Sequence, residues 1–88
     1  MAWWVYLLRC GNGDVYVGLT DNLERRLKEH QSGVGGRFTK GMRPVELIYS
    51  ETHATETDAV HREEQLKRWS RTKKLALAAG DSLTLKRA

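Results

Sequence analysis

The chain has 88 residues, of which 40% are hydrophobic and 30% are charged, and its formal net charge is +4. These values are typical of one small domain with a single core, and they argue against an intrinsically disordered chain. The longest apolar run, residues 3–8, is too short to span a membrane, and no basic segment precedes it, so a signal peptide is not expected. A single cysteine, Cys10, excludes an internal disulfide and favours a reducing, cytoplasmic setting. We expect one domain over residues 1–80 and a loosely held tail over residues 81–88.

The sequence predicts three strands. Residues 3–10, WWVYLLRC, are bulky and show little alternation, which is typical of a strand covered on both faces. Gly-Asn-Gly-Asp at 11–14 has the composition of a hairpin turn, so residues 15–18 are the returning strand. Residues 45–52 alternate well enough for a third strand. The expected fold is α/β: a small three-stranded antiparallel sheet, with the first strand central, flanked by helices.

The length of the hairpin loop decides whether Tyr6 and Tyr16 share a face of the sheet, because side chains alternate along a strand. A two-residue loop over 12–13 puts the two rings on opposite faces. A three-residue loop over 12–14 pairs Tyr16 with Cys10 and puts both rings on one face. We predict the odd-length loop, or a bulge of equal effect, because only that arrangement builds a shared site.

A helix is expected from Asp21, with Glu24 three residues later as in a capping box and Gly33 as the stop. Arg26 and His30 lie four residues apart on it, so they are neighbours beside its inward-facing leucines. For either residue alone, a structural role is the commoner outcome. The arginine would lie along the core edge, and the histidine would be a cation at the helix C-terminus.

The connection over residues 33–41, GVGGRFTKG, is rich in glycine and carries Arg37 and Lys40. A functional interpretation makes it a flexible lip over a phosphate. The alternative is an ordinary connection, since the glycines do not have the spacing of a phosphate-binding loop.

A second long helix is expected to be capped by Thr55, and a third helical segment to end at Gly80. The inward stripe of the second helix includes Ala59 and Leu66. Glu63 falls inside that stripe, whereas its neighbour Glu64 falls outside it. A carboxylate that faces inward is costly unless a cation, a metal or a hydrogen-bond donor meets it, so Glu63 is the candidate functional acid.

The positive charge is concentrated in residues 62–74, REEQLKRWSRTKK, which carry a net charge of +4 and leave the rest of the chain balanced. A basic run of this kind suits a phosphate backbone. Taken alone, a solvated helix face is the commoner explanation.

These residues together resemble the GIY-YIG nuclease domain, and most closely its small stand-alone bacterial members. The resemblance covers residues 3 to about 77, with the two triplets standing as Val-Tyr-Leu at 5–7 and Tyr-Val-Gly at 16–18. TDNLERRLKEH is similar to the family's first helix, AVHREEQLKRW to its acidic helix, and WSRTKK to the basic continuation of the stand-alone group. The side chains that carry the resemblance in order are Tyr6, Tyr16, Arg26, His30 and Glu63.

The resemblance implies hydrolysis of a phosphodiester by in-line attack of water, assisted by one divalent metal ion. Glu63 would be the only protein ligand of that ion, and its remaining ligands would be waters, which suits Mg²⁺ (or Mn²⁺). Arg26 would stabilise charge on the phosphate oxygens, and Tyr6 and Tyr16 would orient the water, one of them deprotonating it. A free phenol has a pKa of about 10, so its surroundings must help it act as a base. Which tyrosine does so, and whether His30 relays the proton, stays open at this point.

The chain departs from the family at two supporting positions. Some members have a lysine where Leu19 stands, and some have an asparagine where Leu75 stands. These departures leave open a second hypothesis, a catalytically weak accessory module that binds branched DNA or structured RNA. A third and weaker one is a partner-binding domain that uses Trp3, Trp4 and Trp69 as an apolar patch.

The expected partner is nucleic acid, with DNA favoured, and no membrane; the oligomeric state is left open. The candidate contacts with nucleic acid are Arg37, Lys40, Lys67, Arg68, Arg71, Lys73 and Lys74.

Overall fold

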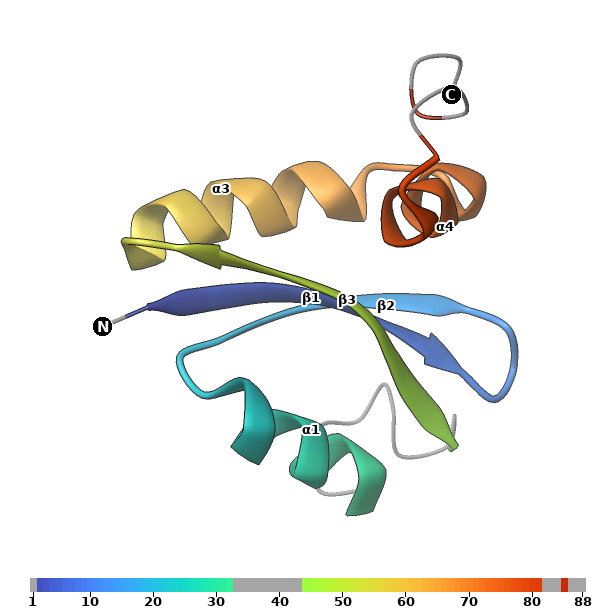
Figure 1. Ribbon diagram of the computed structural model, residues 1–88, viewed down its shortest axis with the longest axis horizontal. Coiled ribbons are helices and arrows are strands. Elements are labelled where there is room, and N and C mark those ends of the chain that lie inside the picture. The colour runs from blue at the N-terminus through green and yellow to red at the C-terminus, as the bar shows by residue number, and fades with distance from the viewer. Residues whose placement is uncertain (1, 33–43, 82–84, 86–88) are drawn as a thin grey trace.

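The computed structural model describes residues 2–32, 44–81 and 85. Its helices and strands follow the predicted order along the chain, as Figure 1 shows. They are β1 (Trp3–Cys10), β2 (Val15–Thr20), α1 (Leu23–Ser32), β3 (Val45–His53), α3 (Glu56–Lys67) and α4 (Arg71–Ala79). Within the part of the chain that is described, no helix is both long and apolar enough to cross a membrane.

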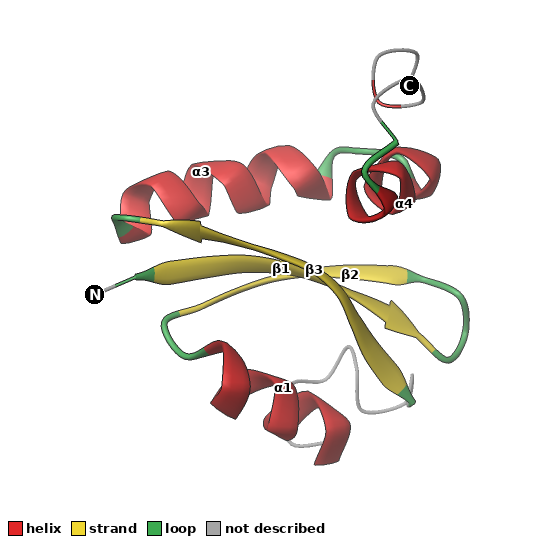
Figure 2. Cartoon of the chain, in the orientation of Figure 1, coloured by secondary structure: helices red, strands yellow, loops and turns green. Residues whose placement is uncertain are grey.

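The three strands form one antiparallel sheet in the order β2-β1-β3. Helices α3 and α4 cover one face of this sheet and α1 covers the other (Figure 2). The predicted three-stranded sheet with the first strand in the centre is therefore confirmed. The predicted tail falls largely outside the described residues.

Strand β1 is buried on both faces, which explains its continuous apolar sequence. Val5 and Leu7 belong to the core under α3, while Tyr6 and Leu8 belong to the core under α1. All four are at most 1% exposed. Full burial of such a side chain contributes about 1.5–3 kcal/mol, so this strand anchors the fold.

The β1–β2 hairpin has an odd-length loop, as predicted, but the loop lies one residue earlier than expected. Leu8, rather than Cys10, is opposite Tyr16, and residues 11–13 form the loop. The Gly13 amide donates to the Cys10 carbonyl (2.9 Å), and Gly13 itself has a φ of +90°. A tight turn followed by a left-handed residue is the usual three-residue hairpin loop, and glycine supplies that conformation without strain. The two tyrosines consequently share a face, as predicted.

Helix α1 begins at Leu23 and not at Asp21. The side chain of Asn22 accepts a hydrogen bond from the Arg25 amide (3.0 Å), so asparagine is the N-cap. Asp21 instead pairs with the Arg25 side chain at 3.3 Å, outside the helix. Leu23 and Leu27 pack against the core around Tyr6, which orients this helix on the sheet.

A bulge in β3 changes which of its side chains face α3. Leu7 of β1 is opposite Tyr49, but the next residue, Leu8, is opposite Leu47, so Ile48 is the extra residue. An inserted residue reverses the alternation of side chains beyond it. The polar half of β3 therefore faces α3.

The predicted Thr55 cap of α3 and the predicted end of α4 at Gly80 are confirmed. The Thr55 hydroxyl accepts from the Asp58 amide (3.2 Å) at the start of α3, and the Ser70 hydroxyl accepts from the Lys73 amide (3.1 Å) at the start of α4. Trp69 lies between the two helices and packs against the core under α3.

Candidate active site

The Tyr6 ring lies across the backbone of the edge strand β2, and Gly18 makes this possible. Tyr6 and Gly18 are opposite each other in the register. A Cβ atom at Gly18 would lie 2.1 Å from Cζ and 2.3 Å from Oη of Tyr6. Real Cβ atoms do not approach other atoms so closely, so only glycine leaves room for this ring. The Tyr6 hydroxyl thereby lies over the outermost strand of the sheet, although its own strand is central.

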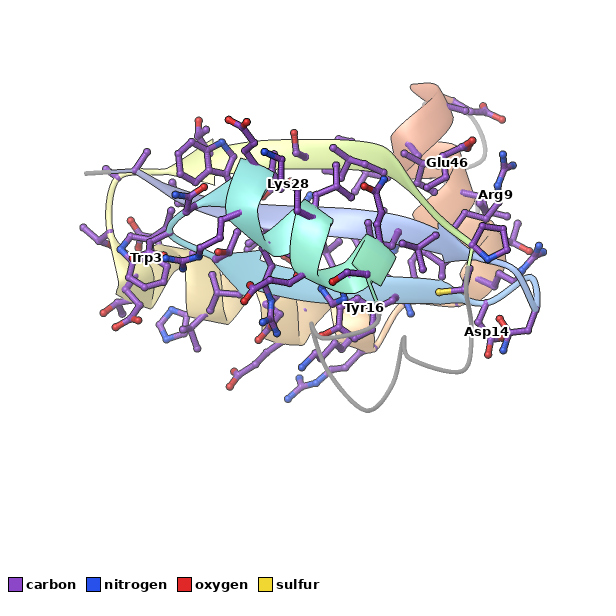
Figure 3. The ribbon with its side chains drawn as sticks, turned by 90° about the horizontal axis from the view of Figure 1, so that it is seen from below. Trp3, Arg9, Asp14, Tyr16, Lys28 and Glu46 are labelled. Atoms are coloured by element: carbon purple, nitrogen blue, oxygen red, sulfur yellow. The ribbon has the colours of Figure 1, made fainter. Side chains whose placement is uncertain are left out.

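Tyr6, Tyr16 and His30 form one compact cluster between the sheet and α1. Oη of Tyr6 lies 2.8 Å from Nε2 of His30, and the Tyr16 and His30 ring centres are 5.2 Å apart. The two tyrosine ring centres are 6.4 Å apart. Figure 3, seen from the α1 side, shows Tyr16 beside the C-terminal part of this helix. The structure therefore brings together three of the five predicted catalytic side chains in direct contact.

Burial determines the protonation states in this cluster. Tyr6 and His30 are both 1% exposed. Burial raises the pKa of Tyr6 to about 12, and the opposing effect of the nearby Arg26 guanidinium is smaller. Burial also lowers the pKa of His30, and the positive charge of Arg26 adds to this. At neutral pH the pair is a neutral phenol beside a neutral imidazole, so His30 is not the surface cation that its place at the end of a helix had suggested.

Arg26 borders the cluster and reaches solvent. Its side chain is 33% exposed, and it interacts with the Tyr6 phenol on one side and with Glu29 at 3.5 Å on the other. A guanidinium in this position has part of its fork of donors directed outward, where a phosphate can meet it.

Glu63 lies on the other side of the sheet, on α3. Its side chain is 18% exposed, whereas that of Glu64 points to solvent, so the predicted difference between these two acids is confirmed. The cation that meets it is Lys67, with Nζ 3.6 Å from Oε1. The negative charge of Glu63 also acts to raise the pKa of Tyr6, as the smallest of the contributions to it. The carboxylate is thus within electrostatic range of the tyrosine cluster.

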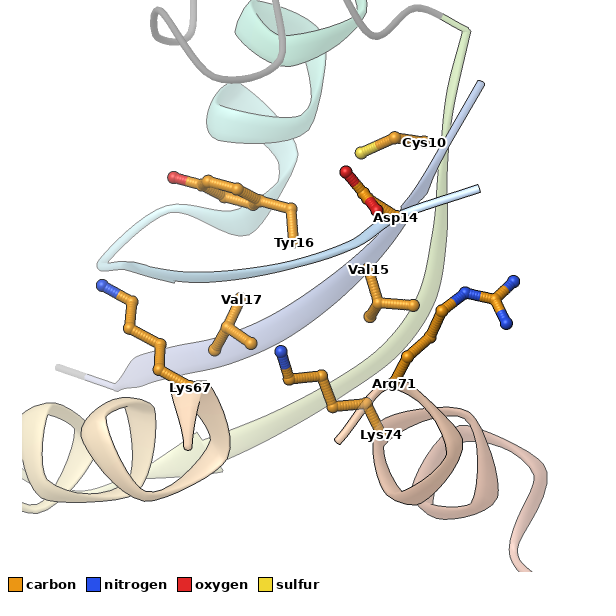
Figure 4. A pocket seen from close by; sticks show the side chains of 8 residues that line it. All are labelled: Cys10, Asp14, Val15, Tyr16, Val17, Lys67, Arg71 and Lys74. Carbon is orange, nitrogen blue, oxygen red and sulfur yellow. The ribbon is translucent and has the colours of Figure 1, made fainter. Parts of the chain in front are cut away.

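The edge of β2 is where the two halves of the site meet. Tyr16 of β2 and Lys67 of α3, the partner of Glu63, line the same hollow of about 500 Å³. Figure 4 shows Tyr16 on one side of β2 and Lys67 extending from the other. The candidate site therefore extends around an edge strand, with the phenols and Arg26 on the α1 side and the carboxylate on the α3 side.

The residues that hold α3 in place were not foreseen from the sequence. The Nε atom of Arg62, the residue before Glu63, donates to both carboxylate oxygens of Glu51 on β3, at 3.2 and 3.0 Å. The Tyr49 hydroxyl donates to the same carboxylate at 2.7 Å, and His53 Nε2 lies 2.5 Å from it. The sequence shows these residues at alternating positions, but the bulge that turns them toward α3 has no clear sequence signal.

Replacing Glu51 by glutamine should destabilise the fold and should make its stability less sensitive to acid. Burial alone would raise the pKa of Glu51, but the hydrogen bonds from Tyr49, His53 and Arg62 outweigh burial and lower this pKa from its ordinary value. A lowered pKa gives stability that is present above about pH 4.5 and is lost as the pH falls through the folded value.

We therefore expect Glu51→Gln to lower the free energy of unfolding by about 1–3 kcal/mol at pH 7 and by less at pH 3. Urea unfolding at both pH values measures this. The exposed Glu46→Gln is the control, because its pair with Arg9 is open to solvent and should contribute under about 1 kcal/mol. Equal losses at pH 7 and pH 3 would contradict the assignment.

The predicted basic run is divided between different surfaces. Lys67, Arg71 and Lys74 line the hollow at β2. Arg68 lines a separate depression on the outside of α3, and Lys73 lies over the Trp69 ring. The other two candidate contacts, Arg37 and Lys40, lie outside the described residues. At one supporting position where the family can carry a cation, Leu19 packs against the core under α3.

Comparison with known proteins identifies the class of domain to which this fold and these side chains belong. The chain belongs to the GIY-YIG catalytic domain family, whose model matches residues 2–76. Membership of this family indicates nuclease chemistry on a nucleic acid.

Its relatives within the family include proteins named UPF0213. That of Bacillus pumilus is 45% identical, over 78% of this chain and 70% of its own length. That of Natronomonas pharaonis is 40% identical, over 90% of this chain and 93% of its own.

Two NMR structures are similar to this one. The UPF0213 protein BH0048 from Bacillus halodurans has a TM-score of 0.59 and 34% identity, covering 92% of this chain and 86% of that one. The E. faecalis protein EF2693 has a TM-score of 0.63 and 33% identity, covering 94% and 88%. The names of these relatives do not specify a substrate or a metal.

Proposed function

We propose that the protein hydrolyses phosphodiester bonds of DNA with the help of one divalent metal ion, Mg²⁺ or Mn²⁺. The observation that supports this most directly is the 2.8 Å contact between Tyr6 and His30 beside the partly exposed Arg26. The Tyr6 ring also belongs to the core, but a phenol held by a neutral imidazole beside an arginine is in addition able to move a proton.

The side chain chemistry of Glu63 fits a hard cation. Mg²⁺ prefers oxygen ligands, keeps several of its waters and is held by one or two carboxylates. Glu63 offers a carboxylate that is partly open to solvent and whose partner, Lys67, is 3.6 Å away and 56% exposed. When bound, the ion would stabilise charge on the phosphate and lower the pKa of a bound water.

Tyr6 and His30 are proposed to act together as the base. With the imidazole proton on Nδ1, the Tyr6 hydroxyl donates to Nε2 of His30, and its oxygen, which Arg26 already contacts, has one further lone pair for the attacking water. The attacking water passes a proton to Tyr6 while the phenol passes its own to His30. The resulting hydroxide forms the new bond to phosphorus as the bond to the leaving sugar oxygen breaks, and that oxygen takes up a proton from solvent. This relay suits a phenol with a pKa of about 12, which is not a phenolate at neutral pH. Burial and the charge of Arg26 lower the pKa of His30, so Nε2 is unprotonated at neutral pH and able to accept a proton, although the same shift makes the imidazole a weaker base.

Arg26 is proposed to bind the non-bridging oxygens of the scissile phosphate. Charge develops on these oxygens during attack, and a guanidinium held in place by Tyr6 and Glu29 stabilises it. Tyr16, in contact with the His30 ring, would orient the water from the β2 side.

A catalytically weak module that binds branched DNA or structured RNA is the second candidate. The observation in its favour is that leucines stand at positions 19 and 75, where some members of the family have a lysine and an asparagine. The basic hollow would bind a phosphate backbone equally well without turnover.

Cleavage assays with the purified protein separate the two. Labelled duplex, flap, fork, junction and single-stranded DNAs and a structured RNA are incubated with Mg²⁺, Mn²⁺ or EDTA. We expect the protein to cleave DNA only when Mg²⁺ or Mn²⁺ is present. A salt-sensitive mobility shift with no cleavage of any substrate would instead establish the binding module. Cleavage of RNA alone would overturn the choice of DNA.

A further inference from the structure

The fold gives two adjacent lysines of α4 different surroundings. Nζ of Lys73 lies 4.3 Å from the centre of the Trp69 ring, and the guanidinium carbon of Arg62 also lies over this indole, 5.3 Å from its centre. Lys74 instead lines the hollow at the edge of β2, and Figure 4 shows its ammonium group directed toward that strand. A basic run that looks uniform in sequence is therefore divided by helical geometry into residues that face the hollow and residues that do not.

The hollow combines an apolar wall with positive charge from two helices. Val15 and Val17 of β2 form part of the wall, and Lys67, Arg71 and Lys74 surround them. Nε of Arg71 donates to the Gly13 carbonyl at 2.7 Å, so this guanidinium is held against the hairpin turn. Among the lining residues that the structure describes, the acid is Asp14, whose carboxylate accepts a hydrogen bond from the Asn12 side chain at 3.0 Å.

The hollow is also continuous with the candidate active site. Tyr16 lines it from β2, and Lys67 joins it to Glu63, 3.6 Å away. A strand of nucleic acid whose scissile phosphate lay at Arg26 and Glu63 would have a further phosphate on each side along its backbone, and the hollow adjoins Glu63 through Lys67.

We propose that the hollow is a second phosphate subsite, in which Lys67, Arg71 and Lys74 bind the sugar–phosphate backbone next to the scissile bond while Val15 and Val17 contact the sugar. This proposal rests on the proposed function only in treating the neighbouring phosphodiester bond as the scissile one. Charge complementarity supports a nucleic-acid backbone, because it presents anionic groups and apolar sugar edges in alternation.

Lys74→Ala and Lys73→Ala provide a matched pair, since each removes one positive charge from neighbouring positions of the same helix. Affinity for a fluorescein-labelled DNA fork is measured by anisotropy in EDTA over a series of KCl concentrations. We expect Lys74→Ala to weaken binding about 3- to 10-fold and to reduce the slope of log K against log [KCl] by about 1. Lys73→Ala should change affinity by less than about 2-fold. Thermal unfolding of both variants confirms that they fold.

Three further comparisons test the subsite, in addition to the size of the loss in affinity. Equal losses in the two variants would overturn the subsite, because only the total charge of the run would then matter. Amide shifts of Val17 and Lys74 in NMR titrations should follow added DNA but not inorganic phosphate at matched ionic strength; equal responses would mean a small-anion site instead. Binding is measured in EDTA, so a difference in affinity between the two lysine variants would support the subsite even if the protein cleaved no substrate. Cleavage of DNA without such a difference would refute the subsite and leave the proposed function intact.

Discussion

Glu63→Gln is expected to reduce metal-dependent cleavage by about 10²- to 10³-fold, while leaving DNA binding in EDTA close to that of the parent. The amide preserves the shape of the side chain but removes the negative charge that would hold the ion. The cost to folding should be small, because the ion pair that is lost is a weak one. Nζ of Lys67 lies 3.6 Å from Oε1 of Glu63, and the lysine side chain is 56% exposed. Initial rates of cleavage of a labelled substrate at several Mg²⁺ concentrations measure the effect, and circular dichroism checks the fold.

The neighbouring residue supplies the control for this experiment. Glu64→Gln makes the same change in charge one position along α3, but its side chain is exposed and turned away from the sheet. It should cleave at nearly the parent rate. If both variants cleaved like the parent, Glu63 would not be the metal ligand and its burial would need another explanation. Restoration of activity in Glu63→Gln by high Mg²⁺ would instead locate the defect in metal affinity.

Much of the architecture was predictable because it depends on local patterns. The continuous apolar run of β1 indicates burial on both faces, and only a central strand has that environment. Thr55 and Ser70 are capping residues with the right neighbours, so the starts of α3 and α4 follow from hydrogen-bond chemistry within a few residues. Arg26 and His30 were placed together by helical spacing alone, and the structure puts both beside Tyr6.

The parts that the sequence did not reveal depend on contacts between distant segments. The bulge at Ile48 is set by how β3 meets β1, and it alone turns Glu51 toward Arg62. The different roles of Lys73 and Lys74 depend on where α4 sits relative to Trp69 and β2. That Glu63 approaches the tyrosines around the edge of a sheet, rather than from the same layer, likewise follows from three-dimensional packing.

Gly18→Ala should both destabilise the protein and reduce its activity, because the added methyl group would occupy the space of the Tyr6 ring. The Cβ atom would lie 2.1 Å from Cζ, 2.3 Å from Oη and 2.6 Å from Cε2 of Tyr6. The ring is enclosed on both sides, being 1% exposed, so it has little room to move aside. Overpacking of this kind costs about 1–3 kcal/mol, which urea unfolding measures. Any displacement of the ring also disturbs the 2.8 Å contact with His30, so cleavage should fall more than the loss of folded protein explains.

A double-mutant cycle with Tyr6→Leu tests this explanation. Leucine lacks the three ring atoms that Cβ of residue 18 would meet, so the alanine substitution should cost much less in that background than in the parent. Additive effects on the free energy of unfolding would show that the glycine is required for a reason other than the close approach of the ring. Strong coupling would establish that the glycine of the Tyr-Val-Gly triplet exists to let a central-strand tyrosine reach the edge of the sheet. The phenol that we propose to be catalytic and the glycine opposite it would then be one structural unit, and neither could be changed alone.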